Sequence, residues 1–426
     1  MNKIEFYKET NFKQTPIGKI PRDWKIVRLK DIALISSGNT APQEKMYFED
    51  GKFPFIRVQH LNKLEEQKYP TQFDLINELA ISELKLKKFR KGSIIFPKSG
   101  ESIRLEKRAI LREDSFVVNH LAVIEPIHQE AHNMFLFYYL CTIKTSDYLT
   151  KTTMPSLNLS TIQTFYIPLP PVVEQRAVAE VLSVVDLAIQ KTDMVIAKTE
   201  RLKKGLMQTL LTRGIGHKEF KDTEIGKIPK TWQTVKLKEV AEIRGNKIVS
   251  SFEKVAFIPM ELIPDSEIFV KYEVRNLKDV SSSTYCEAGD LLLAKITPSL
   301  ENGKQGIVPE DIPNGFALAT TEVYPIVCKY IDKLFLFYVL KLPKIRKILE
   351  FSMRGTTGRQ RVPKEAVENL RIPLPPYEEQ QEIADILLKV DEKLEFEKKE
   401  RARLEIIKQG LMDLLLTGKV RVKVIK

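Results

Sequence analysis

Two stretches of the 426-residue chain recur in the same order, and this repeat constrains the fold more than any other feature. FKQTPIGKIPRDW at residues 12–24 returns as FKDTEIGKIPKTW at 220–232, with nine of thirteen positions identical. IPLPPVVEQRAVAEVLSVVD at 167–186 returns as IPLPPYEEQQEIADILLKVD at 372–391, with eleven of twenty identical. Fainter matches between them, such as FLFYYL at 135–140 and FLFYVL at 335–340, keep the order. The sequence therefore predicts one fold used twice.

Length and composition agree with a folded protein of two or more domains. Hydrophobic residues make up 43% of the chain and charged residues 29%, and the formal net charge of +12 suggests a polyanionic partner. The N-terminal MNKIEFYKETNFK lacks the apolar core of a signal peptide, and the longest apolar run, MFLFYYLCTI at 134–143, is half a membrane span. We expect a soluble, cytoplasmic protein without a membrane partner.

Each copy consists of two different parts. The first part is rich in short β-type stretches such as FPFIRV (53–58) and FVVNHLAVI (116–124), separated by turn residues. The second part follows the repeated Pro-Pro and contains no proline or glycine until Gly205 in one copy and Gly410 in the other. The sequence therefore predicts a mixed, mostly β globular domain followed by one long helix, twice.

The predicted long helices carry a hydrophobic stripe. Steps of three and four, sustained over both helices, predict a coiled coil. The stripe comprises Val178, Leu182, Val185, Ile189, Ile196, Leu202, Leu206 and Leu210 in one helix, and Ile383, Leu387, Val390, Leu394, Leu404, Ile407, Leu411 and Leu414 in the other. Since the first helix leads into the second copy, twofold-related copies require antiparallel helices. The predicted fold class is α+β, with two globular domains, two long antiparallel coiled-coil helices and a pseudo-twofold internal repeat.

The repeated motifs resemble those of the specificity subunit of type I restriction–modification systems. The resemblance rests on IGKIPxxW at the start of each half, IPLPPxxEQ before each long helix and GTTGRQRVP at 355–363, and it covers residues 12 to 417. It implies the following boundaries: target recognition domain 1 at 1–166, spacer helix 1 at 167–212, target recognition domain 2 at 213–371, spacer helix 2 at 372–417 and a tail at 418–426.

The resemblance also implies a function and partners. The chain would bind double-stranded DNA at a bipartite, asymmetric site, with one half-site for each recognition domain and the helices setting the spacer. It would assemble with two DNA adenine methyltransferase (modification) subunits and with restriction (endonuclease/translocase) subunits, which carry the catalysis. An alternative stays open, in which the chain is a tandem-repeat scaffold that joins protein partners and binds no DNA.

The sequence contains no recognisable catalytic, cofactor or metal motif. We find no NPP[FY] or DPPY methyltransferase motif, and no Gly-Lys pair is followed by the Ser or Thr of a phosphate-binding loop. Cys141, Cys286 and Cys328 are too scattered for a metal site. We therefore predict a non-catalytic chain without a cofactor.

Candidate DNA-binding residues come from turn-rich segments that differ between the copies. Arg and Lys bind phosphates or guanine, and Asn and Gln suit adenine. The GTTGRQR segment is equally compatible with DNA contact and with a scaffolding role, and we expect His120, beside Asn119, to be a core residue. The candidates are Lys98, Ser99, Arg104, Lys107, Arg108 and Asn119 in the first domain, and Lys295, Lys304, Gln305, Thr320, Thr321, Arg354, Arg359, Gln360 and Arg361 in the second.

Overall fold

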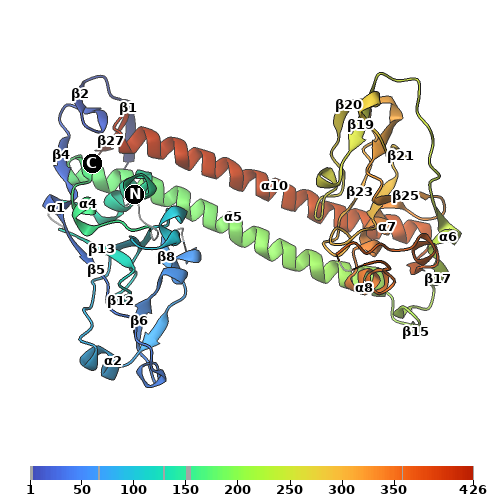
Figure 1. The fold of residues 1–426 in the computed structure, drawn as a ribbon, viewed down its shortest axis with the longest axis horizontal. Coiled ribbons are helices and arrows are strands. Elements are labelled where there is room, and N and C mark those ends of the chain that lie inside the picture. The colour runs from blue at the N-terminus through green and yellow to red at the C-terminus, as the bar shows by residue number, and fades with distance from the viewer. Residues whose placement is uncertain (1–2, 66–67, 128–129, 150–154, 357, 426) are drawn as a thin grey trace. The chain divides into compact units, whose positions relative to one another are not determined.

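The computed structural model describes residues 3–65, 68–127, 130–149, 155–356 and 358–425. Its internal contacts divide the chain into two units: unit 1 comprises Met1–Val195 and Glu397–Lys426, and unit 2 comprises Ile196–Phe396. The two long helices, α5 (Val172–Arg213) and α10 (Tyr377–Leu416), each contribute one half to each unit (Figure 1). Each unit therefore contains one globular domain and two half-helices.

Unit 1 is built on a four-stranded antiparallel sheet in the order β11-β10-β13-β5, next to a three-stranded sheet in the order β12-β6-β9. Its remaining strands form two-stranded ribbons. The strands are β1 (Lys3–Lys8), β2 (Phe12–Thr15), β3 (Gly18–Pro21), β4 (Lys25–Arg28), β5 (Ala33–Ser37), β6 (Phe53–Ile56), β7 (Leu64–Glu65), β8 (Tyr69–Pro70), β9 (Asp74–Ile76), β10 (Ile94–Pro97), β11 (Ala109–Ile110), β12 (Phe116–Val117), β13 (Leu121–Pro126), β14 (Tyr166–Leu169) and β27 (Val420–Ile425). The short helices are α1 (Leu29–Ile32), α2 (Glu78–Glu83), α3 (Asn133–Thr142) and α4 (Leu159–Gln163).

Unit 2 repeats this plan with two four-stranded sheets, in the orders β18-β25-β22-β23 and β20-β19-β24-β21. Its strands are β15 (Phe220–Thr223), β16 (Gly226–Pro229), β17 (Gln233–Lys236), β18 (Ala241–Ile243), β19 (Lys254–Ile258), β20 (Glu273–Asn276), β21 (Thr284–Glu287), β22 (Leu291–Ala294), β23 (Gln305–Ile307), β24 (Phe316–Ala319), β25 (Val323–Cys328) and β26 (Arg371–Leu374). The short helices are α6 (Leu237–Val240), α7 (Lys333–Leu340), α8 (Pro343–Phe351) and α9 (Lys364–Glu368).

The sheets of the two units match in strand order, except that unit 2 has the additional strand β21, and this confirms the predicted duplication. The order β11-β10-β13-β5 corresponds to β23-β22-β25-β18, and all neighbours in both are antiparallel. In the second sheet, the parallel pair β12–β6 corresponds to β24–β19. The repeated FLFYYL and FLFYVL lie on α3 and α7, and all six of these residues are buried in both copies. Both apolar helices belong to the hydrophobic core of their unit.

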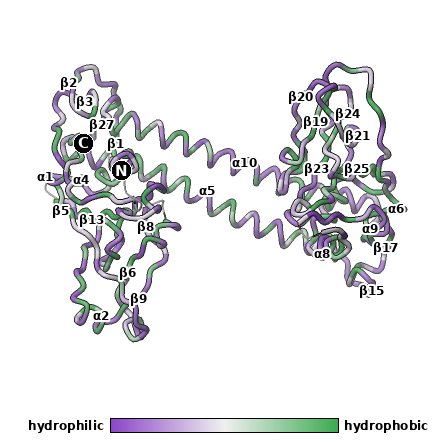
Figure 2. Tube along the Cα trace, in the orientation of Figure 1, coloured by the Kyte–Doolittle hydropathy of each residue, from purple (hydrophilic) through white to green (hydrophobic). Residues whose placement is uncertain are grey.

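The long helices pack together as an antiparallel pair, again as predicted. In unit 1, Asp186 and Asp193 on α5 form ion pairs with Lys408 and Arg401 on α10, at 2.7 and 2.5 Å. A step of seven residues forward along α5 is thus matched by seven residues backward along α10. In unit 2, Lys203 on α5 forms an ion pair with Asp391 on α10. Figure 2 shows hydrophilic and hydrophobic turns alternating along both helices.

The hydrophobic stripe is shifted from its predicted positions near the middle of α5 and the end of α10. Leu202 and Ile407 are 55% and 41% exposed, whereas Thr199 and Met412 are buried. An α-helix with 3.6 residues per turn drifts by about 20° per heptad against a strict seven-residue repeat. The buried face therefore moves to neighbouring residues along helices of 42 and 40 residues.

The two ends of the chain meet in unit 1. Strand β27, in the segment expected to be a tail, pairs with β1 in antiparallel register from Lys3–Ile425 to Lys8–Val420 (Figure 1). Val422 of β27 is buried in the unit 1 core. Among the residues that the structure describes, no helix is both long and apolar enough to cross a membrane.

Candidate nucleic-acid interface

The repeated motifs anchor each long helix to its globular domain. In unit 1, Nε1 of Trp24 donates to the carboxylate of Glu174 at 3.3 Å, and in unit 2, Trp232 donates to Glu379 at 2.9 Å. Both tryptophans are fully buried. The Trp of IGKIPxxW and the Glu of IPLPPxxEQ are thus partners, which explains why both motifs occur in each copy.

The glutamine of the same motif fixes the turn before each helix. Nε2 of Gln175 donates to the carbonyl oxygen of Pro170 at 2.8 Å, and its Oε1 accepts from the backbone N–H of His132. Gln380 repeats both hydrogen bonds, with the carbonyl of Pro375 at 2.9 Å and the N–H of Asp332 at 2.8 Å. The repeated EQ pair is therefore structural in this chain.

A third repeated contact joins α3 or α7 to both long helices. The hydroxyl of Tyr138 donates to Asp186 at 2.6 Å, and Tyr338 donates to Asp391 at 2.8 Å. Burial, and then the neighbouring aspartate charge, raise the pKa of each tyrosine well above its usual value, so both stay protonated and donate. Since each aspartate also pairs with a lysine of the other long helix, this contact fixes the helix register at each domain.

Arg421 of β27 completes the anchor in unit 1. This residue is 5% exposed, and its guanidinium donates to Glu174 at 2.7 and 2.8 Å, to Asp23 at 2.9 Å and to Glu9 at 2.7 Å. The hydrogen bond from Arg421 lowers the pKa of Asp23, which keeps that carboxylate charged. The C-terminal strand is thereby joined to the N-terminal strand, to domain 1 and to α5.

Arg421→Ala is expected to lower the free energy of unfolding by about 3 kcal/mol, because it leaves the buried carboxylate of Glu174 without its cation. Lys419→Ala is the matched control, since Lys419 is exposed and pairs with Asp413 on the surface. We expect that control to cost less than about 0.5 kcal/mol. Urea unfolding measures both values, and an Arg421→Ala variant as stable as the control would contradict the anchor.

The candidate DNA-binding residues of domain 1 fall into two groups. Lys98 and Ser99 follow β10 and meet the turn before β13, where the backbone N–H of Lys98 donates to the carbonyl of His120 at 2.9 Å. The hydroxyl of Ser99 lies 2.6 Å from Nδ1 of His120. Asn119 and His120 are both exposed, so the expectation that His120 is a core residue is wrong. These four residues form one surface, which we call junction 1.

Junction 1 is closed by the segment before α4. The N–H of Leu157 donates to the carbonyl of Lys98 at 2.8 Å, and Ser99 and Ser156 form an isolated β-bridge. The preceding residues 150–154 lie outside the described part of the chain. Three loops therefore meet at this point.

The other candidates of domain 1 lie away from this contact. Arg104 is exposed and pairs with Glu101, and Lys107 donates to Asn62 at 2.7 Å. Arg108 is 4% exposed, lies 4.8 Å over the ring of Phe96 and donates to Glu106 at 2.8 Å. Arg108, which the sequence suggested as a DNA contact, is therefore a buried residue whose guanidinium bonds within the domain.

The same three-loop contact recurs in domain 2 with different side chains. The N–H of Lys295 donates to the carbonyl of Glu322 at 3.0 Å, and the N–H of Val362 donates to the carbonyl of Lys295 at 2.9 Å. Arg361 forms two hydrogen bonds with Glu322, at 2.9 and 2.7 Å. Hydrogen bonding from Arg361 lowers the pKa of Glu322, which is therefore an anion. We call this surface junction 2; it comprises Lys295, Thr320, Thr321, Glu322, Gln360 and Arg361.

The GTTGRQR segment forms a narrow hairpin above junction 2. The backbones of Arg354 and Arg361 exchange two hydrogen bonds, at 3.0 and 2.9 Å, and Gly355 has a φ of +128° that favours glycine. Adding a Cβ at Gly355 would bring it 3.0 Å from the carbonyl oxygen of Arg359. The hairpin thus presents Arg354 and Arg359 on its exposed side, while Thr357 lies outside the described residues.

Two candidates of domain 2 have structural partners instead. Lys304 donates to the carbonyl oxygens of Met260 and Ile263, at 2.7 and 3.0 Å. Gln305 is fully buried and donates to the carbonyl of Phe337 at 2.6 Å. Gln305, which the sequence suggested as a DNA contact, is thus a residue of the core. Glu322, which in the sequence follows Thr320 and Thr321 where the first copy has Asn119 and His120, lies at the same junction.

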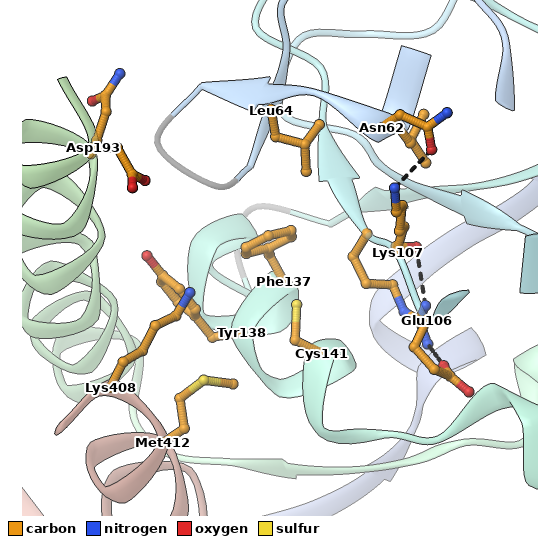
Figure 3. A pocket seen from close by; sticks show the side chains of 13 residues that line it. Asn62, Leu64, Glu106, Lys107, Phe137, Tyr138, Cys141, Asp193, Lys408 and Met412 are labelled. Carbon is orange, nitrogen blue, oxygen red and sulfur yellow. Dashed lines mark hydrogen bonds and ion pairs between the residues drawn. The ribbon is translucent and has the colours of Figure 1, made fainter. Parts of the chain in front are cut away.

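A pocket in unit 1 lies between the end of α10 and the sheet domain. Its volume is about 400 Å³, and Lys408 and Met412 of α10 face Tyr138 and Cys141 of α3 (Figure 3). Cys141 contributes a free thiol to this pocket and is exposed. Within the described residues, no group of three His, Cys, Asp or Glu side chains is placed to hold a metal ion.

Comparisons with known proteins agree with the duplicated architecture. The sequence profile of the type I restriction modification DNA specificity domain matches residues 21–198 and again residues 229–406. The type I restriction enzyme MjaVIII specificity subunit of Methanocaldococcus jannaschii is 29% identical over 432 residues, which cover 99% of this chain and 98% of that protein. The MjaIX specificity subunit of the same organism is 40% identical over 158 residues, or 36% of this chain and 35% of that protein.

The fold has a counterpart among solved structures. The crystal structure of the type I restriction–modification system S subunit from M. genitalium superposes with a TM-score of 0.59 at 15% identity, covering 95% of this chain and 99% of that one. At this identity the likeness concerns the fold alone. Together with the two profile matches, which span most of the chain, it leads to one conclusion: the chain belongs to the family of type I restriction–modification DNA specificity subunits.

Proposed function

We propose that the chain is the sequence-specific DNA-binding subunit of a type I restriction–modification complex. The observation that carries this proposal is the pair of junctions, in which one backbone arrangement holds two different sets of polar side chains. Asn119 and His120 stand in junction 1 where Thr321 and Glu322 stand in junction 2. A backbone arrangement that is repeated with different side chains suits two domains that recognise different half-sites. The recognised DNA site would therefore be bipartite and asymmetric.

The side chains of each junction suggest what kind of contact each could make. The amide of Asn119 could pair with adenine, and a carboxylate such as Glu322 could accept from the amino group of cytosine. Arg361 is held in the plane of Glu322 by two hydrogen bonds, which orients its remaining donors. Lys98, Lys295, Arg354 and Arg359 would bind phosphates. Arg104 and Lys107 remain candidate phosphate contacts at the edge of domain 1.

The long helices would separate the readers and hold the partner subunits. Several large apolar residues on them are exposed, such as Val184 at 57%, Ile406 at 73% and Phe396 at 62%. Exposed apolar side chains that recur along a helix suit an interface with another protein. In this proposal the partners are two DNA adenine methyltransferase subunits and the restriction subunits. Those subunits supply the chemistry, and the chain itself is not an enzyme and acts in the cytoplasm.

Binding to a random DNA duplex separates this proposal from a scaffold that only joins proteins. The isolated chain should bind weakly, and its association constant should fall at least tenfold between 50 and 200 mM salt, because several Lys and Arg side chains displace counterions. Arg359→Ala should reduce the slope of log affinity against log salt by about one unit. A chain with no measurable DNA affinity at 50 mM salt would favour the scaffold.

A further inference from the structure

A groove with an unusual excess of positive charge lies in unit 2. It is lined by residues 200–213 at the end of α5, by the hairpin at 225–228 and by residues 341–345 at the start of α8, and its volume is about 670 Å³. We call it the basic groove. Cavities of this size are typical of sites that enclose a small ligand or a few side chains of a partner.

Six cations line the basic groove against one carboxylate, that of Glu200. Lys203 is neutralised by Asp391, but three other cations, Lys204, Arg213 and Lys227, are exposed and have no ion-pair partner among the described residues. The remaining two are Lys341, which donates to the carbonyl of Asp265 at 2.7 Å, and Lys344, which donates to the carbonyl of Ile225 at 2.9 Å. The groove therefore carries an excess of cations over carboxylates.

One of these cations, Lys341, has a lowered pKa. Burial, followed by the charges of Arg346 and Lys203, lowers the pKa of Lys341 to about 7. A neighbouring carboxylate from another molecule would favour the charged form of this lysine. An anionic group bound in the groove would therefore be stabilised by these cations.

The walls of the groove are also apolar. Met207, Leu211, Ile225 and Leu342 line it beside the cations. A DNA backbone has no group that would profit from these side chains, whereas a protein segment with acidic and apolar residues would satisfy both parts of the lining. The combination therefore favours a peptide segment over nucleic acid.

The corresponding place in unit 1 has lost most of this charge. By the sequence repeat, Lys408 and Met412 there correspond to Lys203 and Met207. Cys141 replaces Lys341, as the match of FLFYYLC with FLFYVLK shows. At the other helix positions, Gln409 replaces Lys204, Asp413 replaces Gln208 and Gly418 replaces Arg213.

We propose that the basic groove seats an acidic and apolar segment of one modification subunit, so that the two modification subunits bind this chain with unequal affinity. This inference rests on the proposed function, because it takes the modification subunit as the partner. It adds that unit 2 offers an electrostatic contact that unit 1 lacks. Complementary charge at such a contact speeds association and makes it salt-dependent.

The test compares two double variants in assembly with the modification subunit of the same system. Lys204→Glu with Lys227→Glu reverses charge in the basic groove, and Gln409→Glu with Lys19→Glu places the same residues at the equivalent, exposed positions of unit 1. Titration followed by native mass spectrometry measures the binding of the first and second modification subunits. The groove variant should weaken one of the two binding steps at least tenfold, and the control should leave both within about twofold of wild type.

Three results would overturn the inference. If wild type binds two modification subunits and both variants behave alike, the groove has no part in docking while the proposed function stands. If the groove variant assembles normally but binds random DNA more weakly, the occupant is phosphate and not a peptide. If wild type binds no modification subunit at all, the proposed function fails and the inference fails with it.

Discussion

Replacing residues 29–165 by the matching segment of a related specificity subunit should change one half of the methylated DNA motif and leave the other half unchanged. The segment lies between the paired strands β4 and β14 and includes all of junction 1. Trp24 and Glu174, which anchor α5, stay in place. Because both long helices and the strands that anchor them are retained, the spacing between the half-sites should also persist.

The reciprocal exchange of residues 237–370, between the paired strands β17 and β26, is the matched control. It replaces junction 2 and should change only the other half of the motif. The motifs are measured by mapping methylated adenines in a host that expresses each chimera with the modification subunit. A chimera that alters both halves, or the spacer, would show that the domains do not read independently.

Inserting one heptad into each long helix should lengthen the unspecified spacer by about three base pairs. Seven helical residues add about 10 Å, and base pairs are spaced about 3.4 Å apart. Insertion between Met194 and Val195 of α5 and between Lys399 and Glu400 of α10 uses equivalent positions of the repeat. Because seven residues match the spacing of the Asp186–Lys408 and Asp193–Arg401 pairs, the helices can keep their contacts.

A heptad inserted into α5 alone is the control for this prediction. It places the ion pairs of α5 and α10 out of register and should abolish assembly or specific methylation. With both heptads present, the specified bases should stay the same, since neither junction is altered. An active complex with an unchanged spacer would mean that the helices do not set the distance.

Sequence reasoning succeeded where the repeat carried the information. The repeated Pro-Pro predicted where both long helices begin. The glutamate that follows it in each copy forms the Trp24–Glu174 or Trp232–Glu379 hydrogen bond. The role of Arg421 could not be predicted in this way. In unit 2 the residue that contacts the equivalent glutamate, Glu379, is His217, whose Nε2 lies 2.8 Å from the carboxylate. A contact made by different residues in the two copies leaves no repeated signal.

The candidate interface was harder to predict because burial depends on packing between distant segments. Arg108 and Gln305 have the residue types of DNA-binding side chains, yet Arg108 lies over the ring of Phe96 and Gln305 donates to the backbone carbonyl of Phe337. His120 was misplaced for the opposite reason, since it borders an apolar strand but lies on the turn before that strand. A single sequence shows which residues could bind DNA, but only the fold shows which of them meet at one surface.

The most direct test of the account is to map N6-methyladenine across the genome of a host that expresses this chain with its modification subunit. The two unlike junctions predict a single bipartite motif, with two different specified segments separated by a fixed number of unspecified base pairs. Methylation should depend on the presence of this chain. A continuous motif, a palindromic motif, or methylation that persists without the chain would contradict the claim that two different readers on one repeated frame select the DNA site.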